Sequence, residues 1–123
     1  MSEAVQSAPK HIRWSEVPVE NVNPLFQRQL VVGTKVMMAH ILLKKDCEVP
    51  LHQHTNEQVS YVESGSMKFF IDGKEIIVKA GEFICIPPDV PHSAVALEDF
   101  VGLDIFTPPR EDWLNKTDIY LRR

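Results

Sequence analysis

Hydrophobic and polar residues alternate over short runs along most of the chain, a pattern that predicts strands rather than helices. Two of these runs flank Asp72-Gly73, and an Asp-Gly pair between alternating runs indicates a two-residue β-hairpin. The runs cover residues 27–32, 66–71, 74–79, 82–86, 92–97 and 100–106, with a weaker one at 11–17 that suggests an edge strand. About eight to ten short strands separated by turns predict an all-β sandwich or barrel.

Residues 34–45 differ from the other runs because hydrophobic residues occupy both alternations. Such a strand is covered on both faces, either by its own domain or by another copy of the chain. Together with the predicted edge strand at 11–17, this run leads us to expect a homodimer. His40 lies inside the run. It is expected to be a hydrogen-bonded core residue, although the alternation would also allow it to point into a barrel.

The 123 residues form one domain without internal repeats. We expect an N-terminal arm at residues 1–20, the barrel at 21–110 and a C-terminal tail at 111–123. Pro108 and Pro109 form a turn, and the acids Glu111 and Asp112 then favour a short helix at the start of the tail.

Composition excludes several classes of partner. The net charge of −4 argues against nucleic acid binding. No apolar run approaches the ~20 residues of a membrane span, and the polar first ten residues do not resemble a signal peptide, so a cytoplasmic protein is expected. Two cysteines are too few for a disulfide scaffold, and Cys47 and Cys85 are expected to be buried thiols, with a role for Cys85 left open.

Potential metal ligands lie near the middle of the chain. His52 and His54 are two residues apart, so in a strand their side chains point to one face, and Gln58 has the same alternation. Glu57 is an alternative ligand to Gln58, but its position in the alternation does not match that of His52 and His54. His92 follows the proline-rich turn 87–91 and supplies a third imidazole. Three imidazoles and one amide oxygen are neutral donors that suit one divalent ion, whether Zn, Ni, Mn or Fe.

The spacing of these residues resembles the two motifs of the cupin family. The first motif reads His52-x-His54, three residues, Gln58, six residues, Gly65, and the second reads Gly81, five residues, Pro87-Pro88-Asp89, two residues, His92, three residues, Ala96. Asp46, Asp89 and Ala96 replace the Gly, Gly and Asn that are usual in the family. None of these positions is a ligand, so the replacements concern loop geometry. The resemblance implies a double-stranded β-helix, or jelly-roll barrel, with the metal inside.

Beyond these motifs the chain resembles the KdgF-type cupins, which open the ring of unsaturated monouronates left by pectin and alginate lyases. The resemblance covers Gln58-Val-Ser-Tyr-Val, residues 87–99 and the signature Leu103-Asp-Ile-Phe-Thr-Pro-Pro-Arg-Glu-Asp-Trp-Leu114. It implies metal at His52, His54, Gln58 and His92. It also implies substrate contact or proton transfer at Asp104, Phe106 and Arg110.

The pattern around Asp104 supports a pocket position for that residue. Asp104 shares its alternation with Gly102 and Phe106, whereas the opposite face is apolar. A carboxylate in such surroundings is typical of a pocket wall. The alternatives are a surface charge for Asp104 and, for Arg110, a tail arginine paired with Glu111 or Asp112. Trp113 is expected to cap the end of the barrel.

The resemblance therefore implies a metal-dependent enzyme acting on a small sugar acid, with Asp104 and Arg110 as catalytic residues and Phe106 and Arg110 as substrate contacts. The division of proton transfer between Asp104 and Arg110 stays open, as does the choice between pectin-derived and alginate-derived uronate. Two alternatives remain: an Fe(II)-dependent dioxygenase, and a non-catalytic sugar-binding or sensor barrel.

Overall fold

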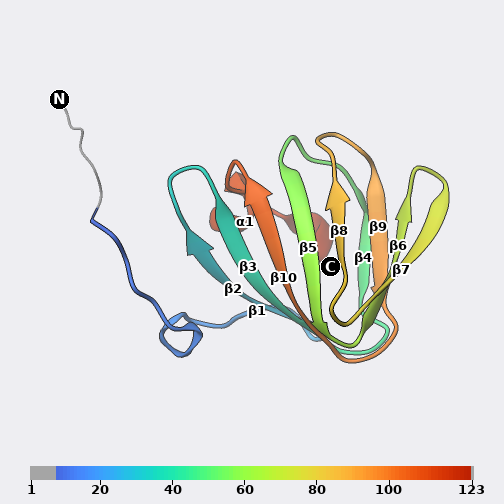
Figure 1. The fold of residues 1–123 in the computed structure, drawn as a ribbon, viewed down its shortest axis with the longest axis horizontal. Helices are drawn as coiled ribbons and strands as arrows, with labels where there is room; N and C mark the ends of the chain where they lie inside the picture. The colour runs from blue at the N-terminus through green and yellow to red at the C-terminus, as the bar shows by residue number, and fades with distance from the viewer. Residues whose placement is uncertain (1–7, 123) are drawn as a thin grey trace.

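Two antiparallel sheets face each other in the computed structural model, which describes residues 8–122 (Figure 1). The larger sheet has the strand order β1-β2-β3-β10-β5-β8, and the smaller has the order β4-β9-β6-β7. The strands are β1 Glu20–Asn23, β2 Phe26–Val32, β3 Met37–Leu43, β4 Glu48–His52, β5 Glu57–Ser64, β6 Ser66–Ile71, β7 Lys74–Lys79, β8 Phe83–Ile86, β9 His92–Ala96 and β10 Phe100–Thr107. The predicted all-β jelly roll is confirmed.

Late strands insert between early ones, and this interleaving closes the core. Strand β10 pairs with both β3 and β5, and β9 pairs with both β4 and β6. The core lies between the inner faces of the two sheets. On β3 the buried and half-buried positions alternate strictly, so that Met37, Ala39 and Ile41 point inward.

The other face of β3 explains why hydrophobic residues fill both alternations. Met38, His40 and Leu42 lie on the outer face of the six-stranded sheet and are half-buried. His40 therefore lies outside the core, although it is hydrogen-bonded as expected. Its Nδ1 donates to Gln29 Oε1 at 2.8 Å, and its ring stacks on Trp14 with the ring centroids 4.8 Å apart.

Two local expectations are wrong. The predicted edge strand at 11–17 contains a 3₁₀ helix instead, Trp14–Glu16, because Glu16 Oε1 accepts the backbone N–H of Arg13 and closes a turn. Cys85 is exposed rather than buried, because it points outward from β8, the edge strand of the larger sheet. Cys47 is buried, as expected. Residues 1–7 of the predicted arm lie outside the described residues.

Turn geometry accounts for the aspartates that replace glycine in the two motifs. The hairpin between β6 and β7 is confirmed, and both of its turn residues, Asp72 and Gly73, have positive φ, as this turn requires. Asp46 and Asp89 also have positive φ, at 73° and 64°. Aspartate is one of the few residues besides glycine that adopts this conformation readily. The loops therefore keep the backbone that glycine would give them.

The C-terminal segment folds back onto the barrel rather than extending as a tail. The predicted short helix is α1, Glu111–Leu114, and a 3₁₀ helix, Ile119–Leu121, follows it. Trp113 and Leu121 are buried in the core. None of the helices within residues 8–122 is long and apolar enough to cross a membrane.

Gly65, the glycine of the first motif, is expected to tolerate no side chain. Its φ is +83°, and a Cβ would collide with the carbonyl oxygen of Asp99. Gly73 has a similar φ of +74° but open space around it, so it is a matched control. In urea unfolding, Gly73→Ala should lose about 1 kcal/mol of stability and Gly65→Ala roughly 3 kcal/mol or more. Equal losses would contradict the steric argument.

Candidate metal centre

The predicted metal ligands come together at one end of the barrel. His52 ends β4 and is the cross-strand partner of His92, which begins β9. Gln58 is the second residue of β5. Strand alternation predicts His54 on the same strand face as His52. In the structure, His54 lies beyond the end of β4 and joins the others through the loop before β5. One ring nitrogen from each of the three histidines lies within 4.8 Å of the other two.

Backbone carbonyls fix the tautomer of all three imidazoles. The Nδ1 atoms of His52, His54 and His92 lie 2.7, 3.0 and 2.8 Å from the carbonyl oxygens of Pro50, Asn56 and Val90. A carbonyl oxygen only accepts, so each Nδ1 carries the proton. Each Nε2 therefore presents a lone pair. Such outer hydrogen bonds orient histidine ligands in metal sites.

Burial keeps the imidazoles neutral. It lowers the pKa of His52 to about 4, helped by the neighbouring His92 and His54. Burial and the positive charge of Arg110 lower the pKa of His54 to about 4, and they shift the pKa of His92 in the same direction. Neutral imidazole is the form that binds metals, so the site is ready for a cation at neutral pH.

Two observations show that a cation fits among these atoms. His92 Nε2 is buried and has no hydrogen-bond partner within the described part of the chain. His54 Nε2 lies 3.1 Å from Gln58 Oε1, which places two lone-pair atoms against each other. A divalent ion satisfies all of these acceptors. The mixed nitrogen and oxygen donors suit Zn, Ni, Mn or Fe, and the geometry does not select one of them.

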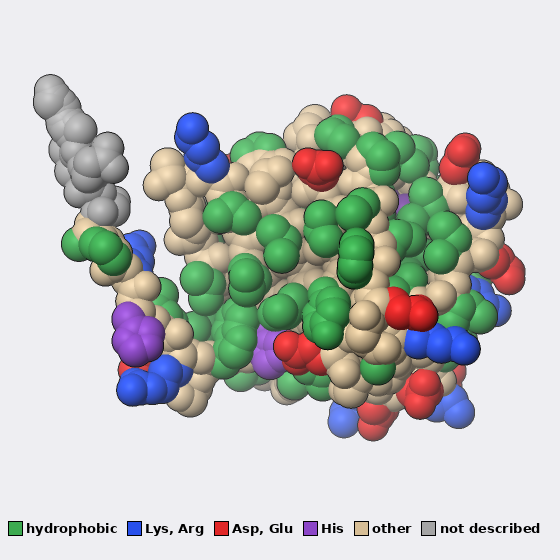
Figure 2. Space-filling view, viewed as in Figure 1, with side chains coloured by type: hydrophobic (Ala, Val, Ile, Leu, Met, Phe, Trp, Pro, Cys, Tyr) green, Lys and Arg blue, Asp and Glu red, His purple; other side chains and the backbone are tan. Residues whose placement is uncertain are grey.

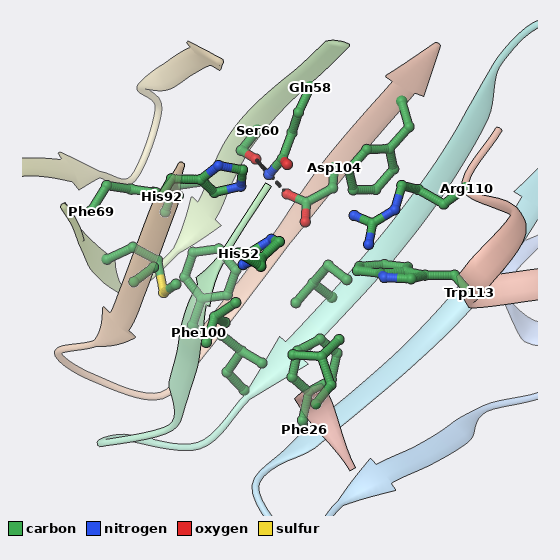
Figure 3. A pocket seen from close by; sticks show the side chains of 18 residues that line it. Phe26, His52, Gln58, Ser60, Phe69, His92, Phe100, Asp104, Arg110 and Trp113 are labelled. Atoms are coloured by element: carbon green, nitrogen blue, oxygen red, sulfur yellow. Dashed lines mark hydrogen bonds between the residues drawn. The ribbon is translucent and has the colours of Figure 1, made fainter. Parts of the chain in front are cut away.

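Ser60 fixes the orientation of the Gln58 amide, although it was not singled out in the sequence. Gln58 Nε2 donates to Ser60 Oγ at 2.9 Å, and Ser60 Oγ donates to Asp104 Oδ1 at 2.6 Å (Figure 3). The amide oxygen therefore faces the histidines. The available signal was that Ser60 shares the alternation of Gln58, and in the sheet it is the cross-strand partner of Asp104.

Asp104 points into the barrel from β10, between Gly102 and Phe106, as the alternation predicts. Burial raises the pKa of Asp104 to about 6, although the hydrogen bond from Ser60 and the charge of Arg110 oppose the shift. Both protonation states of this carboxyl are therefore accessible near neutral pH. Such a group can accept and release protons.

Arg110 lines the cavity and also pairs with Asp112, one of the two tail partners named in the sequence analysis. Its Nε and Nη2 donate to the two carboxylate oxygens of Asp112 at 2.9 and 2.7 Å, and Nη2 also donates to Tyr120 Oη at 2.8 Å. Nη1 is buried without a partner among the described residues. The guanidinium lies over the rings of Phe106 and Trp113, 5.1 and 4.9 Å from their centroids. Arg110 therefore offers a ligand the Nη1 amino group.

A cavity connects these side chains. His52, Gln58, His92, Asp104 and Arg110 lie around it (Figure 3), and hydrophobic residues such as Phe26 and Phe100 form its deeper part. The empty space between these side chains, counted together with open solvent at the mouth, is about 570 Å³. Trp113, which was expected to cap the end of the barrel, lines the wall of this cavity.

Asn56 ties the histidine loop to the loop that carries Arg110. Its side-chain Nδ2 donates to the carbonyl oxygens of Pro108 and Pro109, and its own carbonyl accepts from His54. The side chain is buried. Hydrogen bonds from Asn56 therefore link His54 to the loop that precedes Arg110.

The metal-free protein should lose stability in acid. The folded pKa values of His52 and His54, both about 4, lie below the unfolded value of about 6.5. Between these values the unfolded chain binds more protons, so stability rises with pH through this window and is complete above about 6.5. After chelation, urea unfolding at pH 4.5 should therefore give a clearly smaller free energy than at pH 7.5.

The double variant His52→Gln/His54→Gln should lose most of this pH dependence. His40→Gln, on the outer face of the sheet, is the control that should keep it. Equal stability of the chelated native protein at the two pH values would contradict the burial argument.

Comparison with known proteins agrees with this geometry. Residues 39–106, more than half of the chain, match the family Cupin_2, described as cupin domain. The chain is 29% identical over 102 residues to the pectin degradation protein KdgF of Dickeya dadantii, an alignment that covers 80% of this chain and 93% of that protein.

Two solved structures are similar in fold. KdgF from Halomonas sp. superimposes with a TM-score of 0.81 at 26% identity, covering 86% of this chain and 99% of that one. An RmlC-like cupin from Shewanella frigidimarina gives a TM-score of 0.80 at 29% identity, covering 86% and 96%. With its jelly roll and its match to the cupin domain, this chain belongs to the cupin family.

Proposed function

We propose that this cupin opens the ring of 4,5-unsaturated monouronates from pectin or alginate lyase action and yields the linear keto-uronate. The observation that carries the proposal is that Asp104 and Arg110 line the same cavity as His52, Gln58 and His92. His52 and His92 belong, with His54, to a group of three histidines that could hold a metal ion. The similarity to the pectin degradation protein of Dickeya dadantii supports this substrate class.

The reaction is an isomerisation in which the substrate loses no atom and gains none. The proton of the anomeric hydroxyl leaves, the bond from the anomeric carbon to the ring oxygen breaks, and an aldehyde forms. The ring oxygen becomes the oxygen of an enolate, and a proton then adds to carbon 4 to give the keto acid. The enzyme must therefore remove one proton, return one to carbon and stabilise negative charge on oxygen.

The residues of the cavity match these requirements. Asp104, with its pKa raised to about 6, can hold the proton between the hydroxyl and carbon 4. Arg110 presents Nη1 to the substrate carboxylate, and its charge is kept in place by Asp112. Phe106 offers an apolar surface for the sugar ring.

His52, His54, Gln58 and His92 would hold the ion. When bound, a divalent ion supplies a Lewis acid that stabilises the developing negative charge on oxygen. The hydroxyl of Ser60 donates its proton to Asp104, so it can only accept from the amide nitrogen of Gln58. The amide oxygen of Gln58 is therefore directed toward the three histidines.

Turnover of lyase-derived unsaturated monouronate tests the proposal. Metal-loaded protein should accelerate the loss of the double-bond absorbance, and chelation should abolish the effect. Asp104→Asn should lower kcat by about 100-fold or more, the usual contribution of a general acid–base group, with metal content unchanged. Glu57→Gln, on the exposed face of β5, is the matched control and should retain activity.

The other outcomes identify the alternatives. No acceleration by metal-loaded protein on either uronate would sink the ring-opening proposal. Iron-dependent oxygen consumption would indicate the dioxygenase. Thermal stabilisation by a uronate without turnover would indicate a binding or sensor barrel.

We also propose that the chain forms a homodimer through the outer face of the six-stranded sheet. Hydrophobic side chains gather over this sheet (Figure 2). Val31, Met38, Ile105 and Val59 are cross-strand neighbours in one row across it, and Leu103 lies in the next row. A continuous apolar surface of this kind is typical of an interface.

Light scattering during gel filtration should give twice the mass of one chain. Leu103→Glu should produce the monomer because a charge would be buried in the interface. Ile77→Glu, at a half-exposed position on β7 of the smaller sheet, should leave the dimer intact. A native mass of one chain would contradict this arrangement.

A further inference from the structure

Tyr120 contacts both halves of the candidate site, although it comes from the segment predicted to be a tail. It lies in the 3₁₀ helix Ile119–Leu121, which packs against β4. Its ring stacks on the imidazole of His52, with the centroids 4.6 Å apart and the planes 26° apart. Its hydroxyl meets Arg110. The same side chain therefore touches His52, a candidate metal ligand, and the guanidinium of Arg110.

The hydroxyl of Tyr120 acts as an acceptor in both of its hydrogen bonds. Arg110 Nη2 donates at 2.8 Å and Trp113 Nε1 donates at 3.3 Å. Neither donor can accept, so the phenol oxygen receives both. Asp112 holds the other side of the guanidinium through two further bonds. Arg110 is thus fixed between a carboxylate and a phenol, which leaves Nη1 directed away from both.

The ring of Tyr120 completes the support of His52. The hydrogen bond to Pro50 fixes one edge of this imidazole but leaves the ring able to rotate about that bond. Stacking on Tyr120 restricts this rotation. His52 is therefore held both by a backbone carbonyl and by an aromatic ring, and its Nε2 stays directed at the other donors.

A buried ion-pair network anchors Tyr120 itself. Asp118, two residues earlier, is fully buried and binds Arg28 Nη1 at 2.7 Å and Arg122 Nε at 3.0 Å. Glu20 accepts from the same two arginines. Asn23 Nδ2 also donates to the carbonyl oxygen of Leu121 at 2.8 Å. The segment around Tyr120 is consequently fixed to β1 and β2 on both sides.

We propose that Tyr120 is a positioning residue that aligns His52 for metal binding through its ring and Arg110 for the substrate carboxylate through its hydroxyl. The part that concerns the carboxylate rests on the proposed ring-opening function, whereas the part that concerns the metal does not. The two parts separate chemically, because Tyr120→Phe removes the hydroxyl alone and Tyr120→Leu removes both the hydroxyl and the stacked ring.

The experiment compares these two variants with the native protein and with Tyr61→Phe. Tyr61, the other tyrosine of the chain, lies half-exposed on the outer face of β5 and is the matched control. Three quantities are measured: the Kd of Co²⁺ by titration of the chelated protein, kcat and KM for the unsaturated uronate, and exchange of the Arg110 Nε proton by NMR.

Tyr120→Phe should bind Co²⁺ within about twofold of the native protein, because it keeps the stacked ring. Its KM for the uronate should rise about tenfold with a smaller change in kcat, because a hydrogen bond to a charged group is lost. Proton exchange at Arg110 Nε should become faster. Tyr120→Leu should bind Co²⁺ about two- to tenfold more weakly. Tyr61→Phe should change none of these.

The proposal is overturned if Tyr120→Phe leaves both KM and the exchange at Arg110 unchanged, or if Tyr120→Leu binds Co²⁺ as the native protein does. Should the native protein show no turnover, the ring-opening function fails, and the Co²⁺ and exchange measurements still decide the role of Tyr120. If Tyr120→Leu does not fold, Tyr120→Phe decides the role through KM and exchange. An equal loss of kcat and metal binding in Tyr120→Phe would indicate a general structural defect and overturn the proposal.

Discussion

The pairing of β10 between β3 and β5 is the constraint on which the candidate site depends. It places Asp104 directly opposite Ser60 and Phe106 opposite Gln58, so a residue late in the chain joins a hydrogen-bonded series that begins at a metal ligand. A shift of one residue in this register would turn Asp104 to the outer face and Leu103 inward. Gly102 secures the register, since any side chain there would strike the ring of Phe100 and the backbone of Tyr61.

The electrostatics of the site follow from its neutral ligands. Uncharged donors at the candidate site would leave the full charge of a divalent ion to act on a bound anion, and Arg110 adds a positive charge in the same cavity. Asp104 is the acid of this cavity, and burial raises its pKa to about 6. The arrangement therefore favours an anionic ligand that gains negative charge as it reacts.

Local patterns in the sequence predict a large part of this molecule. The residues of the candidate metal site are predictable because the spacing of the two motifs constrains them, although His54 reaches the group through a loop and not by strand alternation. The β6–β7 hairpin is predictable because Asp72-Gly73 adopts few other conformations. Ser60 and Tyr120 are harder to find, since each depends on a partner far along the chain, Asp104 for Ser60 and His52 for Tyr120, and no spacing rule links these pairs. The side of β3 on which His40 lies was also ambiguous, because hydrophobic residues occupied both alternations.

The ion pair between Arg28 and Asp118 has a consequence for the order of folding. The two residues are separated by 90 positions and both are fully buried. Glu20 is the other carboxylate partner of Arg28, but only Asp118 is fully buried with it. Removing one partner from a buried guanidinium is unfavourable, so sealing of this end of the barrel by β2 is favoured only once the segment around Asp118 arrives. Closing so long a loop is slow compared with forming a hairpin such as β6–β7. We therefore expect this end of the barrel, and the cavity beside it, to form late in folding.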